Sequence, residues 1–221
     1  MRHFYDYDVY VFDCDGVLLD SNSMKIDAMA QALSALDGVA GGTEGCLEFF
    51  KNNFGLSREH HIDRFFADYI KLEEAVEEKP LKQALLSNYT QCVEERYYDA
   101  PLLPMVETIL PKINGACFVA SGTEAGQLTR VLEATGLCTY FLAIFGAPDR
   151  KHEVLARLKT EFDNKSHFVM VGDAAADYQA ARANDFDFFG LTDFSNTPDE
   201  LRRLCNGPHS RAVNDWCELV Q

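Results

Sequence analysis

Five short apolar runs alternate with stretches of helical spacing, and this alternation restricts the fold more than any other feature of the chain. The runs are rich in aromatic and β-branched residues and span 7–13, 116–121, 141–146, 167–173 and 186–191. Helical periodicity between them predicts helices over 124–135, 151–162 and 174–183. Strands that alternate with helices of this length form βαβ units, whose parallel sheet is covered on both faces. The pattern therefore predicts a doubly wound α/β fold.

One long segment interrupts the alternation directly after the first run. Residues 22–96 have helical spacing throughout and contain no run that indicates a buried strand. Within them, GVAGGTEG (38–45) lacks the GK[ST] ending of a phosphate-binding loop and predicts a flexible connection, while LEEAVEEK (72–79) is typical of a solvated helix face. We expect an α/β core domain of residues 1–21 and 97–221, with an all-helical domain of residues 22–96 inserted into it.

Composition and charge limit the class of partner. With 47% apolar and 25% charged residues the chain is typical of a globular protein. A net charge of −15 argues against nucleic acid or an anionic membrane as the main partner, because clustered Lys and Arg bind both. The seven cysteines include no CxxC pair, so they predict neither a disulfide framework nor a zinc site. No apolar run approaches the roughly 20 residues of a membrane span, and we expect a soluble, cytoplasmic protein.

The first apolar run ends in the motif DCDG. Asp13 and Asp15 are two positions apart, so both can face the same side while Cys14 points away. Two carboxylates this close raise each other's cost of ionisation unless a cation or a shared proton relieves them. The pair suits a divalent cation, or a nucleophile beside a general acid; an acidic turn without chemistry is the alternative.

Polar residues also follow the second and third strands of the predicted core. In ASGTEAG, the Ser121 hydroxyl and the amides from Gly122 onward can hold an anion, or Ser121 can simply cap the next helix. Arg150 and Lys151 stand at the start of the following helix, where a cation is unfavourable for the helix dipole. Their position indicates a function for at least one of them.

The fourth strand ends in VGDAAAD, with Asp173 at the strand tip and Asp177 one helical turn later on the same face. Acidic residues in a first helical turn are ordinary helix stabilisers, so Asp177 alone indicates little. The carboxyl ends of parallel strands lie at one edge of a sheet, however, so all of these polar groups are expected to meet there.

The motifs DCDGVLLDS, ASGT, Lys151 and GDAAAD resemble, in this order, the four motifs of the haloacid dehalogenase superfamily of phosphohydrolases. The resemblance covers about residues 6–21 and 100–195, and the position of the helical insert matches the helical cap of that superfamily. The chain is similar to the phosphoglycolate phosphatase and β-phosphoglucomutase branches of the superfamily. The resemblance implies a Rossmann-like core with an inserted α-helical cap.

The resemblance also implies the roles of the core residues in the reaction. Asp13 would attack phosphorus to form an aspartyl-phosphate, and Asp15 would protonate the leaving alcohol and later activate water. Ser121 with Gly122, and Lys151, would bind the phosphoryl oxygens. An acid at the position of Asp15 favours phosphate esters, because dehalogenases and most phosphonate hydrolases of the superfamily lack one there.

By the same resemblance the cofactor would be Mg²⁺. Its ligands would be Asp13, the backbone carbonyl of Asp15 and Asp173, and Asp177 would support the site. This would explain why aspartates cluster at the strand ends, because they would bind the cation and react with the phosphoryl group.

The predicted cap carries one candidate for substrate recognition. FGLSREHH (54–61) resembles the cap loop of β-phosphoglucomutases and related sugar-phosphate phosphatases, in which an arginine after a serine binds a distal anion. Arg58 would have that role, because its guanidinium can bind a phosphate or carboxylate with two hydrogen bonds. The alternative is an exposed arginine that opens a helix behind the N-cap Ser57. His60 and His61 are adjacent and point in different directions on a helix, which argues against a shared metal, and Trp216 is expected to pack in the core.

Three departures from the mutase pattern favour hydrolysis. Lys25 replaces a cap-hinge histidine, TEA stands in the second motif where those mutases carry lysine and asparagine, and the acidic motif has the spaced GDxxxD form. The sequence therefore predicts a Mg²⁺-dependent phosphatase of a small phosphorylated metabolite, either a sugar phosphate or a phosphoglycolate-like compound. A phosphosugar mutase is the alternative, and a non-catalytic binding protein on the same fold is the third hypothesis. The oligomeric state is left open.

Overall fold

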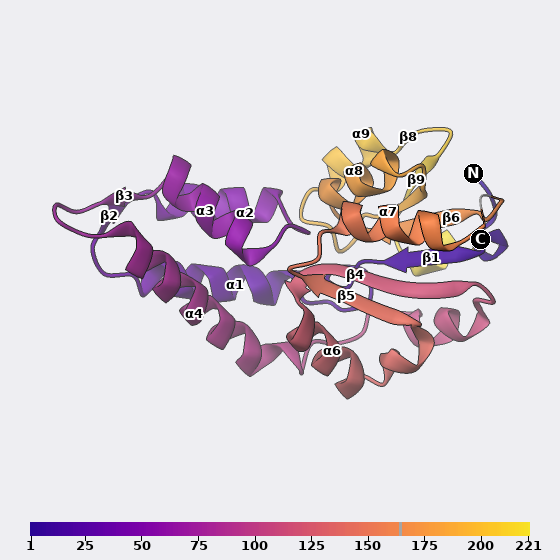
Figure 1. Cartoon of the computed structure of the whole chain (residues 1–221), viewed down its shortest axis with the longest axis horizontal. Coiled ribbons are helices and arrows are strands. Elements are labelled where there is room, and N and C mark those ends of the chain that lie inside the picture. Colours follow the sequence, from indigo (N-terminus) through magenta and orange to yellow (C-terminus); the bar gives the residue numbers. More distant parts are fainter. Residues whose placement is uncertain (164) are drawn as a thin grey trace.

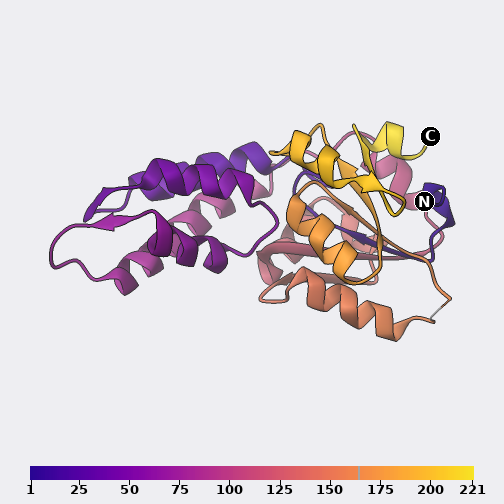
Figure 2. The same cartoon turned by 90° about the horizontal axis from the view of Figure 1, so that it is seen from above.

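The computed structural model describes residues 1–163 and 165–221. An α/β part is built around a parallel sheet, and an elongated helical part projects from one end of it (Figure 1 and Figure 2). This is the predicted doubly wound fold class. None of the helices in the described residues is long and apolar enough to cross a membrane.

The sheet has the strand order β5-β4-β1-β6-β7-β9-β8, with β1 near its middle. All neighbouring strands are parallel except β8 and β9. Its strands are β1 (Val9–Phe12), β4 (Ala116–Glu124), β5 (Ala143–Ala147), β6 (Phe168–Gly172), β7 (Asp187–Leu191), β8 (Asn206–Gly207) and β9 (Ser210–Val213). The five predicted strands are present. The short strands β8 and β9 were not predicted, because they are too brief and polar to show an apolar pattern.

Helices cover both faces of this sheet (Figure 1). Along β1 the side chains alternate: Val9 and Val11 pack against α7, α8 and α9, while Tyr10 and Phe12 pack into the core on the opposite face. The helices of the α/β part are α5 (Val106–Ile109), α6 (Ala125–Ala134), α7 (Lys151–Glu161), α8 (Ala175–Ala183), α9 (Pro198–Leu204) and α10 (Trp216–Leu219). Short 3₁₀ turns are η1 (Phe4–Asp6), η2 (Leu110–Lys112) and η3 (Leu137–Tyr140). Trp216 is buried, as predicted, and its Nε1 donates to the Val17 carbonyl at 2.7 Å.

The helical part contains α1 (Asn22–Ser34), α2 (Thr43–Asn52), α3 (Arg58–Asp68) and α4 (Glu78–Tyr97). The prediction that this part is all-helical is wrong, because β2 (Val39–Gly41) and β3 (Lys71–Leu72) form an antiparallel ribbon at its far end (Figure 1). Residues 38–45 connect α1 to α2, as predicted, and include β2 and the start of α2. Residues 72–79 are largely exposed, as predicted, but the predicted helix is wrong there, since α4 begins only at Glu78. Both strands are so short that pairing with each other, and not local pattern, decides their conformation.

The two chain segments that connect the helical part to the sheet lie side by side at the carboxyl end of β1. Asp20 N donates to the Pro101 carbonyl at 2.8 Å, and Leu103 N donates to the Leu18 carbonyl at 2.9 Å. Both connections therefore pass next to the DCDG motif. The domain boundaries at residues 22 and 96 stay a prediction.

Candidate active site

The DCDG turn brings two acidic groups from neighbouring strands together. Asp13 continues the ladder of β1, since its N–H donates to the Val171 carbonyl of β6 at 2.9 Å. Gly16 has a φ of +72°, and a Cβ at this position would collide with the Asp173 carboxylate. The turn therefore requires glycine, both for its left-handed backbone and for the close approach to Asp173.

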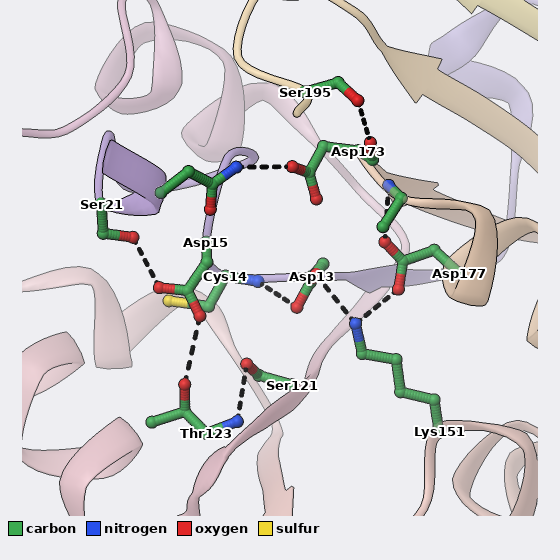
Figure 3. A network of polar contacts seen from close by, with 12 residues as sticks. Asp13, Cys14, Asp15, Ser21, Ser121, Thr123, Lys151, Asp173, Asp177 and Ser195 are labelled. Atoms are coloured by element: carbon green, nitrogen blue, oxygen red, sulfur yellow. Dashed lines mark hydrogen bonds and ion pairs between the residues drawn. The ribbon is translucent and has the colours of Figure 1, made fainter. Parts of the chain in front are cut away.

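Lys151 lies between two of the predicted site aspartates (Figure 3). Its Nζ is 2.8 Å from Asp13 Oδ2 and also donates to Asp177 Oδ1, and all three side chains are buried. Burial alone would lower the pKa of Lys151, but the two carboxylates raise it. Asp13 Oδ1 accepts from the Cys14 N–H at 2.7 Å, and Asp177 Oδ2 accepts from the Ala174 N–H at 3.1 Å. These carboxylates explain how a lysine is tolerated at the N-terminus of α7.

Asp173 follows β6, and both its carboxylate and its backbone carbonyl accept hydrogen bonds. Asn22 Nδ2 donates to its Oδ2 at 2.7 Å, and Ser195 Oγ donates to its backbone carbonyl at 2.5 Å. Carboxylate oxygens of Asp13, Asp173 and Asp177 lie within 4.8 Å of one another. Burial, together with the neighbouring carboxylates, raises the pKa of Asp173 and raises that of Asp13 to about 7. Lys151 thus forms ion pairs with two of the three buried carboxylates, whereas Asp173 has no ion-pair partner within the described residues.

Asp15 has a different environment, although it is only two residues from Asp13. Its Oδ1 accepts from Ser21 Oγ at 2.5 Å and from Tyr97 OH at 2.8 Å. Its Oδ2 accepts from Lys25 Nζ at 2.5 Å and from Thr123 Oγ1 at 3.1 Å. Burial would raise the pKa of Asp15, but the Lys25 charge and the hydrogen bonds outweigh it and lower the pKa. The two aspartates of the motif are therefore neutralised by different lysines.

The second motif is arranged differently from the sequence-based expectation. Strand β4 continues to Glu124, and the Glu124 carboxylate, not Ser121, caps α6 by accepting from the N–H groups of Gly126 and Gln127 at 2.9 and 2.8 Å. The alternative that Ser121 is a helix cap is therefore wrong, and the amides of the helix start are already occupied. The buried Ser121 Oγ instead accepts from the Thr123 N–H at 3.2 Å.

A loop of the helical part covers these residues. A Cβ at Gly122 would lie 2.6 Å from the Leu56 carbonyl oxygen, and a Cβ at Gly55 would lie 3.2 Å from Lys151 Nζ. Beneath the loop is a cavity of about 30 Å³, whose polar lining comprises Asp13, Asp15, Lys25, Arg58, His61, Ser121 and Thr123. Asp13 and Asp15 face the same cavity, as predicted, while Cys14 is not part of its lining. A groove of about 720 Å³ runs along the other side of the loop, and the exposed Arg150 lies in its wall.

Arg58 lines the cavity as a buried cation. It is the first residue of α3 behind the N-cap Ser57, but it is only 8% exposed, so the alternative of an exposed arginine is wrong. Its guanidinium donates to Thr90 Oγ1 at 3.1 Å and to Gln127 Oε1, and lies 5.2 Å from the centre of the Tyr89 ring. No carboxylate within the described parts of the chain forms an ion pair with it. His60 is exposed and His61 buried, so the two histidines diverge as predicted.

Several groups around the site were not predicted. Ser21, the N-cap of α1, and Lys25 are four residues apart. This helical spacing was the sequence signal that their side chains lie on the same face of the helix. Tyr97 lies 82 positions from Asp15, and nothing in the sequence indicated their contact. Gln127 and Asn22 also gave no signal, because a buried amide side chain is recognised only from the groups that surround it.

The arrangement agrees with what comparison to known proteins shows. The family model of haloacid dehalogenase-like hydrolases matches residues 7–185. A curated phosphoglycolate phosphatase of Mesorhizobium japonicum is 26% identical over 206 residues, which cover 89% of this chain and 87% of that protein. The fold is shared with a hydrolase from Pseudomonas syringae (TM-score 0.71, 22% identity, 96% and 95% coverage of this chain and that one). It is also shared with a structure described as a predicted phosphatase from Clostridium acetobutylicum (TM-score 0.72, 18% identity, 97% and 96%). The match over residues 7–185 shows that the chain belongs to the haloacid dehalogenase-like hydrolases.

Proposed function

We propose that this hydrolase is a Mg²⁺-dependent phosphatase of a small phosphorylated metabolite and works through an aspartyl-phosphate intermediate. The observation that carries the proposal is the carboxylate of Asp13, which faces a covered cavity together with Asp15 and Ser121 and is held by Lys151. A nucleophile, a proton-transfer group and anion-binding groups at one cavity are the parts that phosphoryl transfer needs. The similarity to a phosphoglycolate phosphatase supports the same chemistry.

The buried charges fit a divalent cation. Lys25 pairs with Asp15, which leaves Lys151 as the ammonium among Asp13, Asp173 and Asp177. Buried negative charge without a partner is costly, and carboxylate oxygens are the ligands that Mg²⁺ prefers. Mg²⁺ would be held by Asp13, Asp173 and the backbone carbonyl of Asp15, with Asp177 orienting Lys151. When bound, it would offset charge on the phosphoryl group.

The residues of the cavity divide the reaction between them. The Asp13 carboxylate attacks phosphorus, and the bond from phosphorus to the leaving-group oxygen breaks as the new bond forms. Asp15 gives a proton to that oxygen and later takes one from the water that hydrolyses the aspartyl-phosphate. The Ser121 hydroxyl, the Gly122 amide and Lys151 bind the phosphoryl oxygens and stabilise their charge.

Arg58 defines the class of leaving group. Its buried guanidinium has only neutral partners within the described residues, namely Thr90, Gln127 and the Tyr89 ring. A buried cation without a counter-ion is costly, so the cavity favours a substrate that brings a second anionic group, such as a carboxylate. A phosphorylated small acid satisfies this condition.

The test is phosphate release from a panel of phosphorylated metabolites, with Mg²⁺ present and with EDTA added. We expect metal-dependent release from the wild type and a loss of at least ~10³-fold in Asp13→Asn, because the covalent intermediate cannot form. Asp199→Asn, a substitution of an aspartate whose side chain is 92% exposed, is the matched control and should keep full activity. Activity retained in Asp13→Asn, or unaffected by EDTA, would contradict the proposal.

The product separates the two alternatives from phosphatase activity. Rearranged sugar phosphate without free phosphate would support a phosphosugar mutase instead. If no compound of the panel is converted in Mg²⁺, the protein would be better described as a non-catalytic binding protein on this fold.

A further inference from the structure

We propose that Lys25 is a positioning residue for Asp15, which holds the carboxylate at the wall of the active-site cavity in the orientation for proton transfer to the leaving group. The inference rests on the proposed function, in which Asp15 exchanges that proton. It assigns a role in the reaction to a lysine that lies in the first turn of α1, outside the four motifs.

The first observation is that the Asp15 carboxylate has a fixed orientation. Each of its oxygens accepts two hydrogen bonds: Oδ1 from Ser21 and Tyr97, and Oδ2 from Lys25 and Thr123. Rotation of the carboxylate would break all of these bonds inside a buried site, where an unpaired polar group is costly. The ring of donors therefore determines which oxygen faces the cavity.

The second observation concerns which Asp15 oxygen has donors that line the cavity. Lys25 and Thr123, which bind Oδ2, line the cavity together with Asp15, whereas Ser21 and Tyr97, which bind Oδ1, do not. Oδ2 is therefore the oxygen that can reach a leaving group. Of its two donors, Lys25 is the closer, at 2.5 Å against 3.1 Å, and the charged one.

The third observation is that Lys25 is itself held in place. Its Nζ donates to Thr123 Oγ1 at 2.6 Å and lies 4.4 Å from the centre of the Tyr97 ring. The side chain is only 7% exposed, and Asp15 is its ion-pair partner. These contacts fix the ammonium of Lys25 against Asp15.

Lys25 and Tyr97 also come from the two helices that adjoin the sheet. Lys25 lies at the start of α1 and Tyr97 is the last residue of α4, next to the two connections to the α/β part. The orientation of Asp15 therefore depends on how the helical part sits against the sheet. The helical part thus covers the cavity through the loop at Gly55 and Leu56, and orients Asp15 through Lys25 and Tyr97.

The experiment compares leaving groups. The measured quantity is kcat/KM, which reports the steps up to departure of the leaving group and not the later hydrolysis of the aspartyl-phosphate, where Asp15 serves every substrate alike. In Lys25→Met we expect kcat/KM to fall ~100-fold for the alkyl phosphate that the wild type hydrolyses best, because proton transfer to its oxygen contributes at least about that factor. For 4-nitrophenyl phosphate, whose leaving group needs little protonation, we expect less than a ~5-fold change in kcat/KM. In the double variant Lys25→Met/Asp15→Asn we expect no loss beyond that of Asp15→Asn alone, because Lys25 acts through Asp15.

Lys82→Met is the matched control, because Lys82 also forms ion pairs and lies near an aromatic ring in the helical part, but at its surface. It should leave both substrates unaffected. Equal losses of kcat/KM on both substrates in Lys25→Met, or additive losses of kcat/KM in the double variant, would each overturn the inference.

Tyr97→Phe provides a second test that keeps the packing of the ring, in case Lys25→Met fails to fold. It removes only the hydroxyl that donates to Oδ1, and we expect a ~10-fold loss of kcat/KM on the alkyl phosphate with no change of kcat/KM on 4-nitrophenyl phosphate. An equal loss on both would contradict the inference. Absence of any Mg²⁺-dependent release by the wild type would instead defeat the proposed function, so the two failures are distinguishable.

Discussion

At the scale of single residues, the site uses two neighbouring aspartates in opposite ways. Asp13 shares Lys151 with another carboxylate, and its pKa is raised, whereas Asp15 has Lys25 to itself, and its pKa is lowered. The pKa values of side chains two positions apart in one motif are thus shifted in opposite directions, because their surroundings come from different elements.

Gln127 permits a test of the cavity's preference for anions. Its Oε1 accepts from Arg58, so Gln127→Glu would place a carboxylate against the guanidinium with almost no change in shape. We expect KM for substrates with a second anionic group to rise at least ~10-fold, which corresponds to about 1.4 kcal/mol. For 4-nitrophenyl phosphate, which lacks that group, we expect kcat and KM to stay within ~2-fold of the wild type.

The matched control is Gln91→Glu, the same substitution at an exposed position of α4. It should change neither substrate class. An unchanged KM for anionic substrates in Gln127→Glu would show that Arg58 does not bind the second anion.

At the scale of elements, α6 begins with an acidic cap, and not with the Ser121 hydroxyl cap that was the alternative to anion binding. Glu124 accepts from the Gly126 and Gln127 N–H groups, and these hydrogen bonds lower its pKa. Replacing a capping group typically costs about 1 kcal/mol, so we expect Glu124→Gln to lower the free energy of unfolding by that amount at pH 7. Chemical denaturation at several pH values would measure it.

The pH dependence of this effect has a defined sign. The folded-state pKa of Glu124 lies below its usual value of 4.5, so the charged cap stabilises the fold above that pH. The difference between wild type and Glu124→Gln should therefore shrink as the pH falls below about 4.5, through the folded-state pKa. Glu133→Gln, in the last turn of the same helix, is the control and should not destabilise the protein. A difference that does not depend on pH would exclude the charged cap as its cause.

At the scale of the whole molecule, stability should depend on the divalent cation. Asp13, Asp173 and Asp177 place like charges in the core of a chain whose net charge is already −15. A ligand that binds only the folded state at 100 times its Kd stabilises that state by about 2.7 kcal/mol, so Mg²⁺ should raise the Tm. Thermal melts with Mg²⁺, and with NaCl at matched ionic strength to separate general screening, would measure the effect.

The Asp173→Asn variant should differ from the wild type both in its Tm without Mg²⁺ and in its response to Mg²⁺. Without Mg²⁺ its Tm should exceed that of the wild type, because a buried charge without a cationic partner has been removed. The rise in Tm on adding Mg²⁺ should be largely lost. An equal Mg²⁺-induced rise in the variant and the wild type would place the cation elsewhere.

The sequence by itself determined the alternation of strands and helices and the grouping of acids at the strand ends. Both depend on local information: periodicity assigns each segment, and parallel strands direct their carboxyl ends to one edge. The order of residues along the chain is therefore enough to expect Asp13, Ser121, Lys151 and Asp173 in one place.

Only the tertiary structure decided which partner each group takes. The hydrogen bond of Tyr97 to Asp15, the burial of Arg58 against Gln127, and the pairing of β2 with β3 join residues that lie far apart in the chain. Such contacts leave no periodic trace in the sequence, because they form only when distant segments of the chain pack together. The opposite pKa shifts of Asp13 and Asp15 follow from that packing.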